Sequence, residues 1–266
     1  MRLVRSSRST FNGVSNAPIV QLHGVSRQFD ATDALGAIDL SIAAGSFVSL
    51  VGPSGCGKST LFNVVSGLVA PSTGEVIVDG RNVTGSPGHV GYMLQKDLLV
   101  PWRTVIGNIT LGAALRGRVM SSDVDEAVAM ATKYGLGEFL DHYPAALSGG
   151  MRQRVAFMRT LASRHPVLLL DEPFGALDAQ TRFAMQEWLL SVWQDTGRTV
   201  LFITHDVDEA LFLSDRVLVM SPRPGRIVDD VGVDLERPRS LATLTAPRFM
   251  ELKQRILRQL HDGGQI

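Results

Sequence analysis

The chain has only one cysteine, Cys56, among its 266 residues. It therefore lacks the means to build an internal disulfide framework, and this cysteine usage fits a reducing compartment. An excess of either charge is also missing, because Lys plus Arg and Asp plus Glu each total 26. The balance removes the usual electrostatic argument for nucleic acid as the main partner, although it leaves a local basic face open.

Long apolar runs are absent as well. No stretch approaches the roughly 20 residues that span a bilayer, so any work at a membrane would be done from outside the lipid. Residues 1–18 contain Arg2, Arg5 and Arg8 among Ser, Asn and Gly, without the apolar middle segment of a secretory signal. An organelle transit peptide would share this composition but needs an amphipathic face. We expect a disordered tail instead, with the fold beginning near Ile19.

Short apolar runs alternate with helical patterns along most of the chain. Five runs have the length and composition of strands buried on both faces: 47–51, 75–78, 167–170, 199–203 and 216–220. Three sets of apolar residues follow helical spacing: Leu61, Val64, Val65 and Leu68; Met151, Val155, Met158 and Ala162; and Met185, Trp188, Leu189 and Val192. This alternation predicts an α/β domain with a largely parallel sheet.

Two regions differ from this alternation. Residues 98–147 show a helical pattern around Ala131 and no convincing strand. After Pro222 the chain is polar and punctuated by proline, and an amphipathic helix is expected over 248–260. We find no internal repeat, so the sequence predicts one domain with helical additions.

A glycine-rich loop follows the predicted strand 47–51 and precedes a predicted helix. Its residues fit G-x-x-x-x-G-K-[ST]: Gly52, Pro53, Ser54, Gly55, Cys56, Gly57, Lys58, Ser59 and then Thr60. Glycines let backbone N–H groups approach phosphate oxygens, and the helix N-terminus adds partial positive charge. Lys58 would reach the β- and γ-phosphates and the Ser59 hydroxyl would bind Mg²⁺. An ordinary glycine-rich turn is the alternative.

Two carboxylates, Asp171 and Glu172, directly follow the predicted strand 167–170. Adjacent side chains at a strand end point in different directions, so the two acids can take different roles. Alone, such a pair is more often a solvated strand end. Together with the phosphate loop it indicates catalysis.

The octapeptide LSGGMRQR at 147–154 lies between the phosphate loop and these acids, and it resembles the signature of the ATP-binding cassette (ABC) family. Ser148 is expected to cap a helix that Gly149 and Gly150 open. The resemblance implies a P-loop NTPase ABC cassette of the α/β class. It also implies a RecA-like core sheet, an antiparallel β subdomain and a helical subdomain. The expected boundaries are 19–235 for the cassette, about 98–160 for the helical subdomain and 236–266 for a C-terminal helical extension.

The resemblance also implies roles for individual residues. Asp171 would hold Mg²⁺ and Glu172 would act as general base on the attacking water. The helix start at Ser148, Gly149 and Gly150 would bind the γ-phosphate of an ATP held by a second cassette. Nucleotide would then join two copies of the chain.

Smaller features match the same family. Gln95 corresponds to a glutamine that senses the γ-phosphate and contributes to the metal site, and His205 to a switch histidine followed by a capping box with Asp206 as N-cap. Asp178, in Ala176-Leu177-Asp178, matches a loop that contacts the partner subunit. Phe29 occupies the place of an aromatic that stacks on adenine, although a lone phenylalanine is as often a core residue.

The segment LLVPWRTV at 98–105 resembles ATPase subunits of the nitrate, sulfonate and taurine importers. That resemblance implies a peripheral subunit on the cytoplasmic face of the membrane, working with ATP, Mg²⁺, a second cassette and integral-membrane permease subunits. An extracytoplasmic solute-binding protein would act indirectly, and nucleic acid is not expected as a partner. Alternatives are an importer of another solute, an exporter motor or a soluble ABC ATPase. Gene neighbourhood or co-purification with a membrane subunit distinguishes them.

Cys56 carries one further expectation. A thiol in an exposed loop beside Lys58 and a helix N-terminus would favour the thiolate. We therefore expect Cys56 to react with maleimides, with protection by MgATP.

Overall fold

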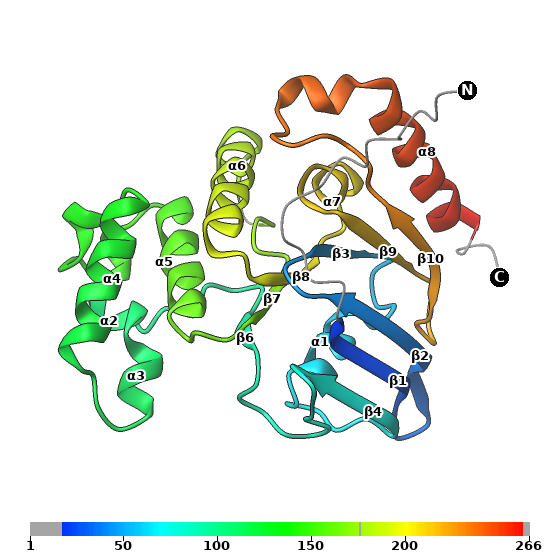
Figure 1. Ribbon diagram of the computed structural model, residues 1–266, viewed down its shortest axis with the longest axis horizontal. Helices are drawn as coiled ribbons and strands as arrows, with labels where there is room; N and C mark the ends of the chain where they lie inside the picture. Colours follow the sequence, from blue (N-terminus) through cyan, green and yellow to red (C-terminus); the bar gives the residue numbers. More distant parts are fainter. Residues whose placement is uncertain (1–17, 176, 263–266) are drawn as a thin grey trace, which may run out of the picture.

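The computed structural model describes residues 18–175 and 177–262, and Figure 1 shows how its elements are arranged. The tail expected at 1–18 lies, except for Pro18, outside the described residues, as does Ala176. Two sheets form the centre of the molecule. The expected division between the cassette, ending at 235, and the C-terminal extension, beginning at 236, remains an interpretation.

A six-stranded core sheet has the order β10-β9-β3-β8-β7-β6, in which only β10 runs antiparallel to its neighbour. Its strands are β3 (Phe47–Val51), β6 (Gly91–Met93), β7 (Val167–Asp171), β8 (Thr199–Ile203), β9 (Arg216–Met220) and β10 (Ile227–Gly232). A second, antiparallel sheet has the order β2-β1-β4-β5. It consists of β1 (Pro18–Phe29), β2 (Thr32–Ala43), β4 (Thr73–Val78) and β5 (Arg81–Asn82). The α/β class and the two-sheet expectation are confirmed.

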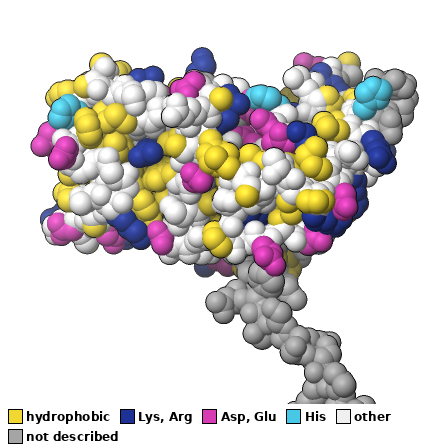
Figure 2. Space-filling model, turned by 90° about the horizontal axis from the view of Figure 1, so that it is seen from above, with side chains coloured by type: hydrophobic (Ala, Val, Ile, Leu, Met, Phe, Trp, Pro, Cys, Tyr) yellow, Lys and Arg dark blue, Asp and Glu magenta, His cyan; other side chains and the backbone are white. Residues whose placement is uncertain are grey.

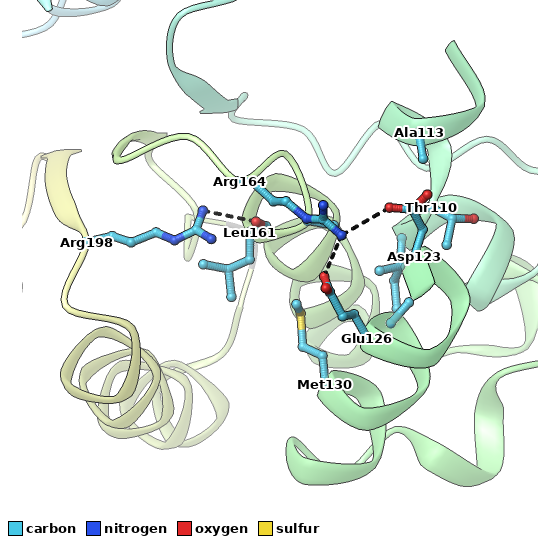
Figure 3. Close-up of a pocket in the computed structure, with 11 residues that line it drawn as sticks. Thr110, Ala113, Asp123, Glu126, Met130, Leu161, Arg164 and Arg198 are labelled. Carbon is cyan, nitrogen blue, oxygen red and sulfur yellow. Dashed lines mark hydrogen bonds and ion pairs between the residues drawn. The ribbon is translucent and has the colours of Figure 1, made fainter. Parts of the chain in front are cut away.

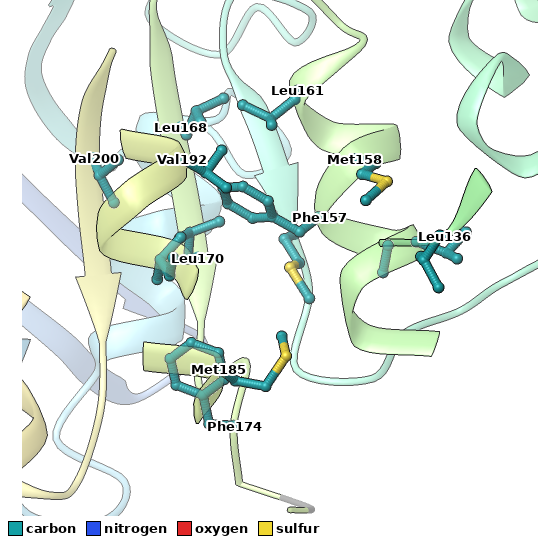
Figure 4. Close-up of a cluster of buried hydrophobic side chains, with 14 of the residues drawn as sticks. Leu136, Phe157, Met158, Leu161, Leu168, Leu170, Phe174, Met185, Val192 and Val200 are labelled. Carbon is teal, nitrogen blue, oxygen red and sulfur yellow. The ribbon is translucent and has the colours of Figure 1, made fainter. Parts of the chain in front are cut away.

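The central strands of the core sheet, β3, β7 and β8, are buried along their whole length because nearly all of their residues are apolar. In β7, Leu168 and Leu170 pack on the side of the long helices, whereas Val167 and Leu169 pack toward the antiparallel sheet. Figure 4 shows the first side, where Leu168 and Leu170 meet Phe157 and other apolar side chains. The sheet is thus a rigid platform whose strand ends are fixed in position.

The helices cover this platform from several sides. They are α1 (Lys58–Val65), α2 (Val105–Ile109), α3 (Leu111–Leu115), α4 (Ser121–Lys133), α5 (Gly149–Leu161), α6 (Ala179–Thr196), α7 (Val207–Leu213) and α8 (Pro247–Asp262). Short 3₁₀ turns lie at Gly137–Phe139, Pro144–Ala146 and Leu241–Thr245. Figure 1 shows α2 to α5 grouped at one end, α1 between the two sheets, and α6 and α7 on the opposite face of the core sheet.

The predicted C-terminal helix is confirmed as α8. Three residues on one side of this helix pack with buried residues of α7, β9 and β10. They are Phe249, Leu252 and Ile256, which are spaced three and four residues apart. Helix α8 is therefore packed against the core sheet. One helical prediction is wrong: Leu68 is exposed, because α1 ends at Val65 and Gly67 follows with a φ of 76°.

Charged side chains are interspersed on the surface. On the face seen from above in Figure 2, basic side chains occur in small groups with acidic side chains nearby. None of the helices within the described ranges combines the length and hydropathy that crossing a bilayer requires. The expectation that nucleic acid is not a partner stays a prediction.

Candidate active site

Four neighbouring parallel strands, β3, β8, β7 and β6, end at the same edge of the core sheet. The segments that leave them carry most of the predicted site residues. These segments are the glycine-rich loop at 52–57 after β3, Thr204 and His205 after β8, Glu172 after β7 and Gln95 after β6. Carboxyl ends of parallel strands form the usual ligand crevice of such sheets.

The glycine-rich loop needs its glycines for geometric reasons. Gly55 and Gly57 have φ values of 74° and 108°, which side chains rarely adopt. A Cβ atom on Gly57 would also lie 2.7 Å from Leu35 and 2.8 Å from the carbonyl oxygen of Ala34. Gly57 forms the N-cap of α1 without a side chain, so the first N–H groups of that helix are left for another acceptor.

Lys58 is the first residue of α1, and its side chain turns back over the loop. Nζ donates to the carbonyl oxygens of Gly52, at 2.8 Å, and Pro53, at 3.0 Å. The ammonium group is buried against the loop that it would serve. This places a cation and a helix N-terminus together, which suits a phosphate.

The expectation that Cys56 is exposed is wrong. Its side chain is 1 % exposed and packs in the core cluster below the antiparallel sheet. Sγ lies 3.8 Å from Nζ of Lys58, on the inner side of the loop. The reason is that Cys56 Sγ occupies the space that Gly52 leaves open, where a Cβ atom on Gly52 would lie 2.9 Å from it. At position 56 only the backbone can face a ligand.

Asp171 is the last residue of β7 and is buried beside α1. Tyr92 Oη lies 3.5 Å from its Oδ2, and Ser59 also makes a side-chain hydrogen bond to it. Burial raises the pKa of the Asp171 carboxyl, while the hydrogen bond from Ser59 opposes that rise. A carboxylate and a hydroxyl thus meet next to the phosphate loop.

Glu172 lies in a different environment from its neighbour. Its backbone has a φ of 44°, which is uncommon for a residue with a side chain, and its N–H donates to the carbonyl of Ile203. Gln95 Nε2 donates to Glu172 Oε2 at 3.1 Å, and His205 Nδ1 lies 3.4 Å from the same oxygen. The structure therefore brings together the three residues predicted to be catalytic.

The turn that carries His205 is only partly as predicted. Asp206 is the N-cap of α7 and accepts from the N–H groups of Asp208 and Glu209, which confirms the cap. The reciprocal half of the capping box is wrong. Glu209 points inward and accepts from Gln186 of α6 at 2.9 Å, so its side chain does not return to the cap.

The signature segment begins α5, as predicted. Ser148 is the N-cap and accepts from the Met151 N–H. A Cβ atom on Gly150 would lie 3.1 Å from Thr181, and one on Gly149 would lie 3.7 Å from Leu177. The start of α5 thus lies against the start of α6, whose N-cap is Asp178, and space is tight at Gly150. Ser148, Gly149, Gly150 and Asp178 share one surface.

This surface is distinct from the strand-end cluster in the same chain. Figure 1 shows α5 with α2, α3 and α4 at one end of the molecule, apart from α1. Phe29 also lies outside the cluster, at the end of β1. It is 39 % exposed, with the guanidinium of Arg27 4.3 Å from its ring centre, so it is not a core residue.

The oxygen donors beside the phosphate loop fit a hard divalent cation. Carboxylate and hydroxyl oxygens are what Mg²⁺ prefers, and the buried Asp171 carboxylate next to Ser59 supplies both. Gln95, the third predicted ligand, uses its amide nitrogen to contact Glu172. Its amide oxygen is the group that would bind a metal.

Sequence reasoning missed Tyr92, Thr204 and the inward role of Glu209. Thr204 directly follows β8 and precedes His205, and this adjacency was the available signal; Tyr92 lies within β6, three residues before Gln95. Glu209 gave a misleading signal, because its spacing from Asp206 matched a capping box.

A separate cavity of about 70 Å³ lies among α2 to α5 and Arg198, far from the strand-end cluster (Figure 3). Its charged side chains are already paired. Arg164 lies 3.2 Å from Asp123 and 2.8 Å from Glu126, and Arg198 donates to the carbonyl of Leu161. We assign this cavity no ligand.

Comparison with known proteins gives consistent matches. Residues 35–175 match the sequence family described as ABC transporter. An uncharacterised ABC transporter ATP-binding protein of Methanocaldococcus jannaschii is 46% identical over 86% of this chain and 85% of its own length. An aliphatic sulfonates import ATP-binding protein of Bacillus cereus is 41% identical, covering 93% of this chain and 98% of its own length. A taurine import ATP-binding protein of Yersinia pestis is 40% identical, with coverages of 93% and 99%.

A solved structure shares the fold and part of the sequence. It is a dimeric ATP-binding cassette in a post-hydrolysis state bound to ADP and Pi. It superimposes with a TM-score of 0.70 at 30% identity, covering 82% of this chain and all of the other.

Proposed function

This chain belongs to the family of ABC transporter ATP-binding proteins, and from that premise we propose that it is the motor subunit of an importer. Members of this family are ATPases, and this chain is one. Its cargo would be a small anion such as a sulfonate, taurine or nitrate, carried through a separate permease. One observation carries the catalytic proposal: Gln95 and His205 meet at one oxygen of Glu172, beside the loop of Lys58.

The chemical step follows from this arrangement. Lys58 and the N–H groups of the loop bind the β- and γ-phosphates of ATP. Glu172 takes a proton from water as the water oxygen bonds to the γ-phosphorus and the bond to the β–γ bridging oxygen breaks. The contacts with Gln95 and His205 both involve Oε2, so we assign Oε1 to the attacking water. ADP and phosphate are the products.

Ser59, Asp171 and Gln95 are the residues that would hold Mg²⁺. When bound, the ion neutralises charge on the phosphate oxygens. Asp171 serves this purpose because its carboxylate is fixed between Tyr92 and Ser59, whereas Glu172 stays available to water.

Two copies of the chain would share each nucleotide. The Ser148-Gly149-Gly150 helix start has donors for a phosphate, yet it lies apart from the chain's own phosphate loop. A second copy facing it with its loop would complete both sites, with Asp178 at the contact. The solved relative in a dimeric state supports this arrangement.

Contact with the permease would use exposed apolar residues near Gln95. Trp102 is 77 % exposed, and Leu94 and Leu98 are exposed as well. Large exposed side chains of this kind are typical of interaction sites. The chain would then lie peripherally on the cytoplasmic face of the membrane, while cargo selection would reside in the permease and the extracytoplasmic solute-binding protein.

The proposal is tested by reconstitution. The chain is co-expressed with the membrane subunit encoded beside its gene, purified through that subunit and placed in proteoliposomes. Binding protein loaded with a sulfonate, taurine or nitrate should stimulate ATP hydrolysis. Glu172→Gln should co-purify equally but lose roughly 10²–10⁴-fold in turnover, the usual contribution of a general base. Failure to co-purify, or hydrolysis unaffected by any loaded binding protein, would reject the importer proposal.

A further inference from the structure

A buried carboxylate lies directly behind the turn that carries His205. Glu209, on α7, is 6 % exposed, and its Oε1 accepts from Nε2 of Gln186 at 2.9 Å. Gln186, on α6, is itself 7 % exposed. Two polar side chains on facing helices therefore contact each other away from water. Apolar residues of the same size would often be at least as stabilising at such a position.

The same carboxylate also contacts the turn. Thr204, which is buried, makes a side-chain hydrogen bond to Glu209. The Thr204 hydroxyl oxygen accepts from the Asp206 N–H at 3.0 Å, so its own proton is the one donated to the carboxylate. These two bonds fix the residues on either side of His205.

His205 itself has a 65 % exposed side chain, so little packing holds it. Its Nδ1 nevertheless lies 3.4 Å from Glu172 Oε2. The backbone of the turn must then supply the orientation, and the bonds made by Thr204 are what fix that backbone.

The opposite end of the network reaches α6. Gln186 lies on the same helix as Arg182, which donates to the carbonyl of Leu177 at 2.9 Å. Arg182 also acts electrostatically on Glu209. The start of α6 is capped by Asp178, at the surface shared with Gly149 and Gly150. Glu209 thus connects the His205 turn to the helix that begins at this surface.

We propose that Glu209 is a positioning residue for ATP hydrolysis: through Thr204 it holds His205 against Glu172, and through Gln186 it ties that turn to α6. This inference rests on the proposed roles of Glu172 and His205. Glu209 touches neither nucleotide nor water in the reaction. Its loss acts on turnover and leaves ATP binding by the Lys58 loop intact.

The test compares steady-state kinetics of four variants with the unaltered chain. Glu209→Leu and Thr204→Val each remove the link to the turn and should lower kcat about tenfold, a fraction of what a catalytic base contributes. KM for ATP and the dissociation constant of a fluorescent ATP analogue should stay unchanged. Glu209→Gln should retain kcat within about threefold, because the Gln186 amide can flip and keep both hydrogen bonds. The double variant Glu209→Leu with Thr204→Val should be no slower than either single variant.

Ser214→Ala is the matched control. Ser214 is buried at the C-terminal end of the same helix, where its hydroxyl contacts Ser49, away from the His205 turn. Its loss should lower thermal stability without changing kcat. If Glu209→Leu lowers stability like Ser214→Ala and leaves kcat unchanged, the inference is overturned. Should Glu209→Leu fail to fold, Thr204→Val decides the matter alone, and an unchanged kcat there overturns it too.

Glu172→Gln, measured in the same assay, separates this inference from the proposed function. Turnover retained by Glu172→Gln would contradict the catalytic assignment and, with it, the role of Glu209. Turnover lost by Glu172→Gln but kept by both Glu209→Leu and Thr204→Val would overturn the positioning role only.

Discussion

Asp171 and Glu172 are neighbours in the chain but have different surroundings. Asp171 completes a buried strand, and burial raises the pKa of its carboxyl despite hydrogen bonds from Ser59 and Tyr92. Glu172 turns away through an unusual backbone conformation and meets Gln95 and His205. The positive φ is therefore the local feature that separates the carboxylate proposed to bind Mg²⁺ from the one proposed to accept the proton.

Cys56 provides a prediction at the residue scale. Because the Cys56 thiol is buried beneath the phosphate loop, maleimide can react with it only when the loop opens. Labelling of the folded chain should be at least about tenfold slower than labelling in denaturant, where the thiol is accessible. Mass spectrometry after timed quenching measures both rates. Equal rates would show that Cys56 is exposed in solution.

At the scale of elements, the site is a product of strand order. Because β8 lies between β3 and β7, the turn after β8 brings His205 between the phosphate loop and Glu172. Helices α6 and α7 then support that turn from behind through Gln186 and Glu209. Replacing Gln186 or Glu209 should therefore affect both stability and catalysis.

Glu209 gives a pH prediction at this scale. Burial raises the pKa of its carboxyl above the ordinary value of 4.5, with Asp206 adding to the rise and Thr204, Gln186 and Arg182 opposing it. Below pH 4.5 the Glu209 carboxyl is protonated in both the folded and the unfolded chain. As pH rises, the unfolded chain releases it first, so the penalty on folding grows until the folded-state pKa is passed.

Glu209→Gln removes this titration. Its melting temperature relative to the unaltered chain should therefore rise between pH 4.5 and neutral pH, as differential scanning calorimetry would record. Glu187→Gln, which changes an exposed glutamate on α6, is the control and should show no such trend. If the melting-temperature difference between Glu209→Gln and the unaltered chain fell with increasing pH, burial would not be what raises the pKa of Glu209.

Elements whose patterns are local could be predicted from the sequence, and those set by tertiary contacts could not. β3, β8 and β9 match the predicted runs because strands buried on both faces are mostly apolar. β1 was missed because its alternation breaks at Gly24, where the register shifts between Leu22 and Val25. The burial of Cys56 was missed because the core cluster around it is built from residues of distant segments, such as Leu35 and Met220.

Within the candidate site, too, some features could be predicted from the sequence and others could not. Motif spacing identified the phosphate loop and the acids, because that chemistry requires particular residues at fixed separations. It could not identify the bond from Gln186 to Glu209, which joins two helices through side chains. Such contacts follow from packing, which no local pattern encodes.

At the scale of the whole molecule, two surfaces that would bind one nucleotide lie apart in the chain. The Lys58 loop is at the strand ends, and the Ser148 helix start is with the helices at one end of the molecule (Figure 1). A single copy would therefore hold two half-sites. The central claim is that ATP joins two copies by bringing these halves together.

The most direct test mixes two inactive variants. Lys58→Ala should lose nucleotide binding at its own loop. Ser148→Arg should bind ATP but fail to complete a partner's site, because a bulky cation replaces a small donor. Ser148 also caps α5, and losing a cap costs about 1 kcal/mol, so Ser148→Ala serves as the control that removes the hydroxyl without adding bulk or charge.

The measurement is ATP-dependent association of the mixed variants by light scattering, with subunit exchange confirmed by mass spectrometry. A mixed dimer has one complete site, formed by the loop of the Ser148→Arg chain and the signature of the Lys58→Ala chain. We expect association, absent from either variant alone, to appear on mixing and to peak near equal proportions. Absence of association at every mixing ratio, with exchange confirmed, would contradict the claim that Ser148 acts across a dimer.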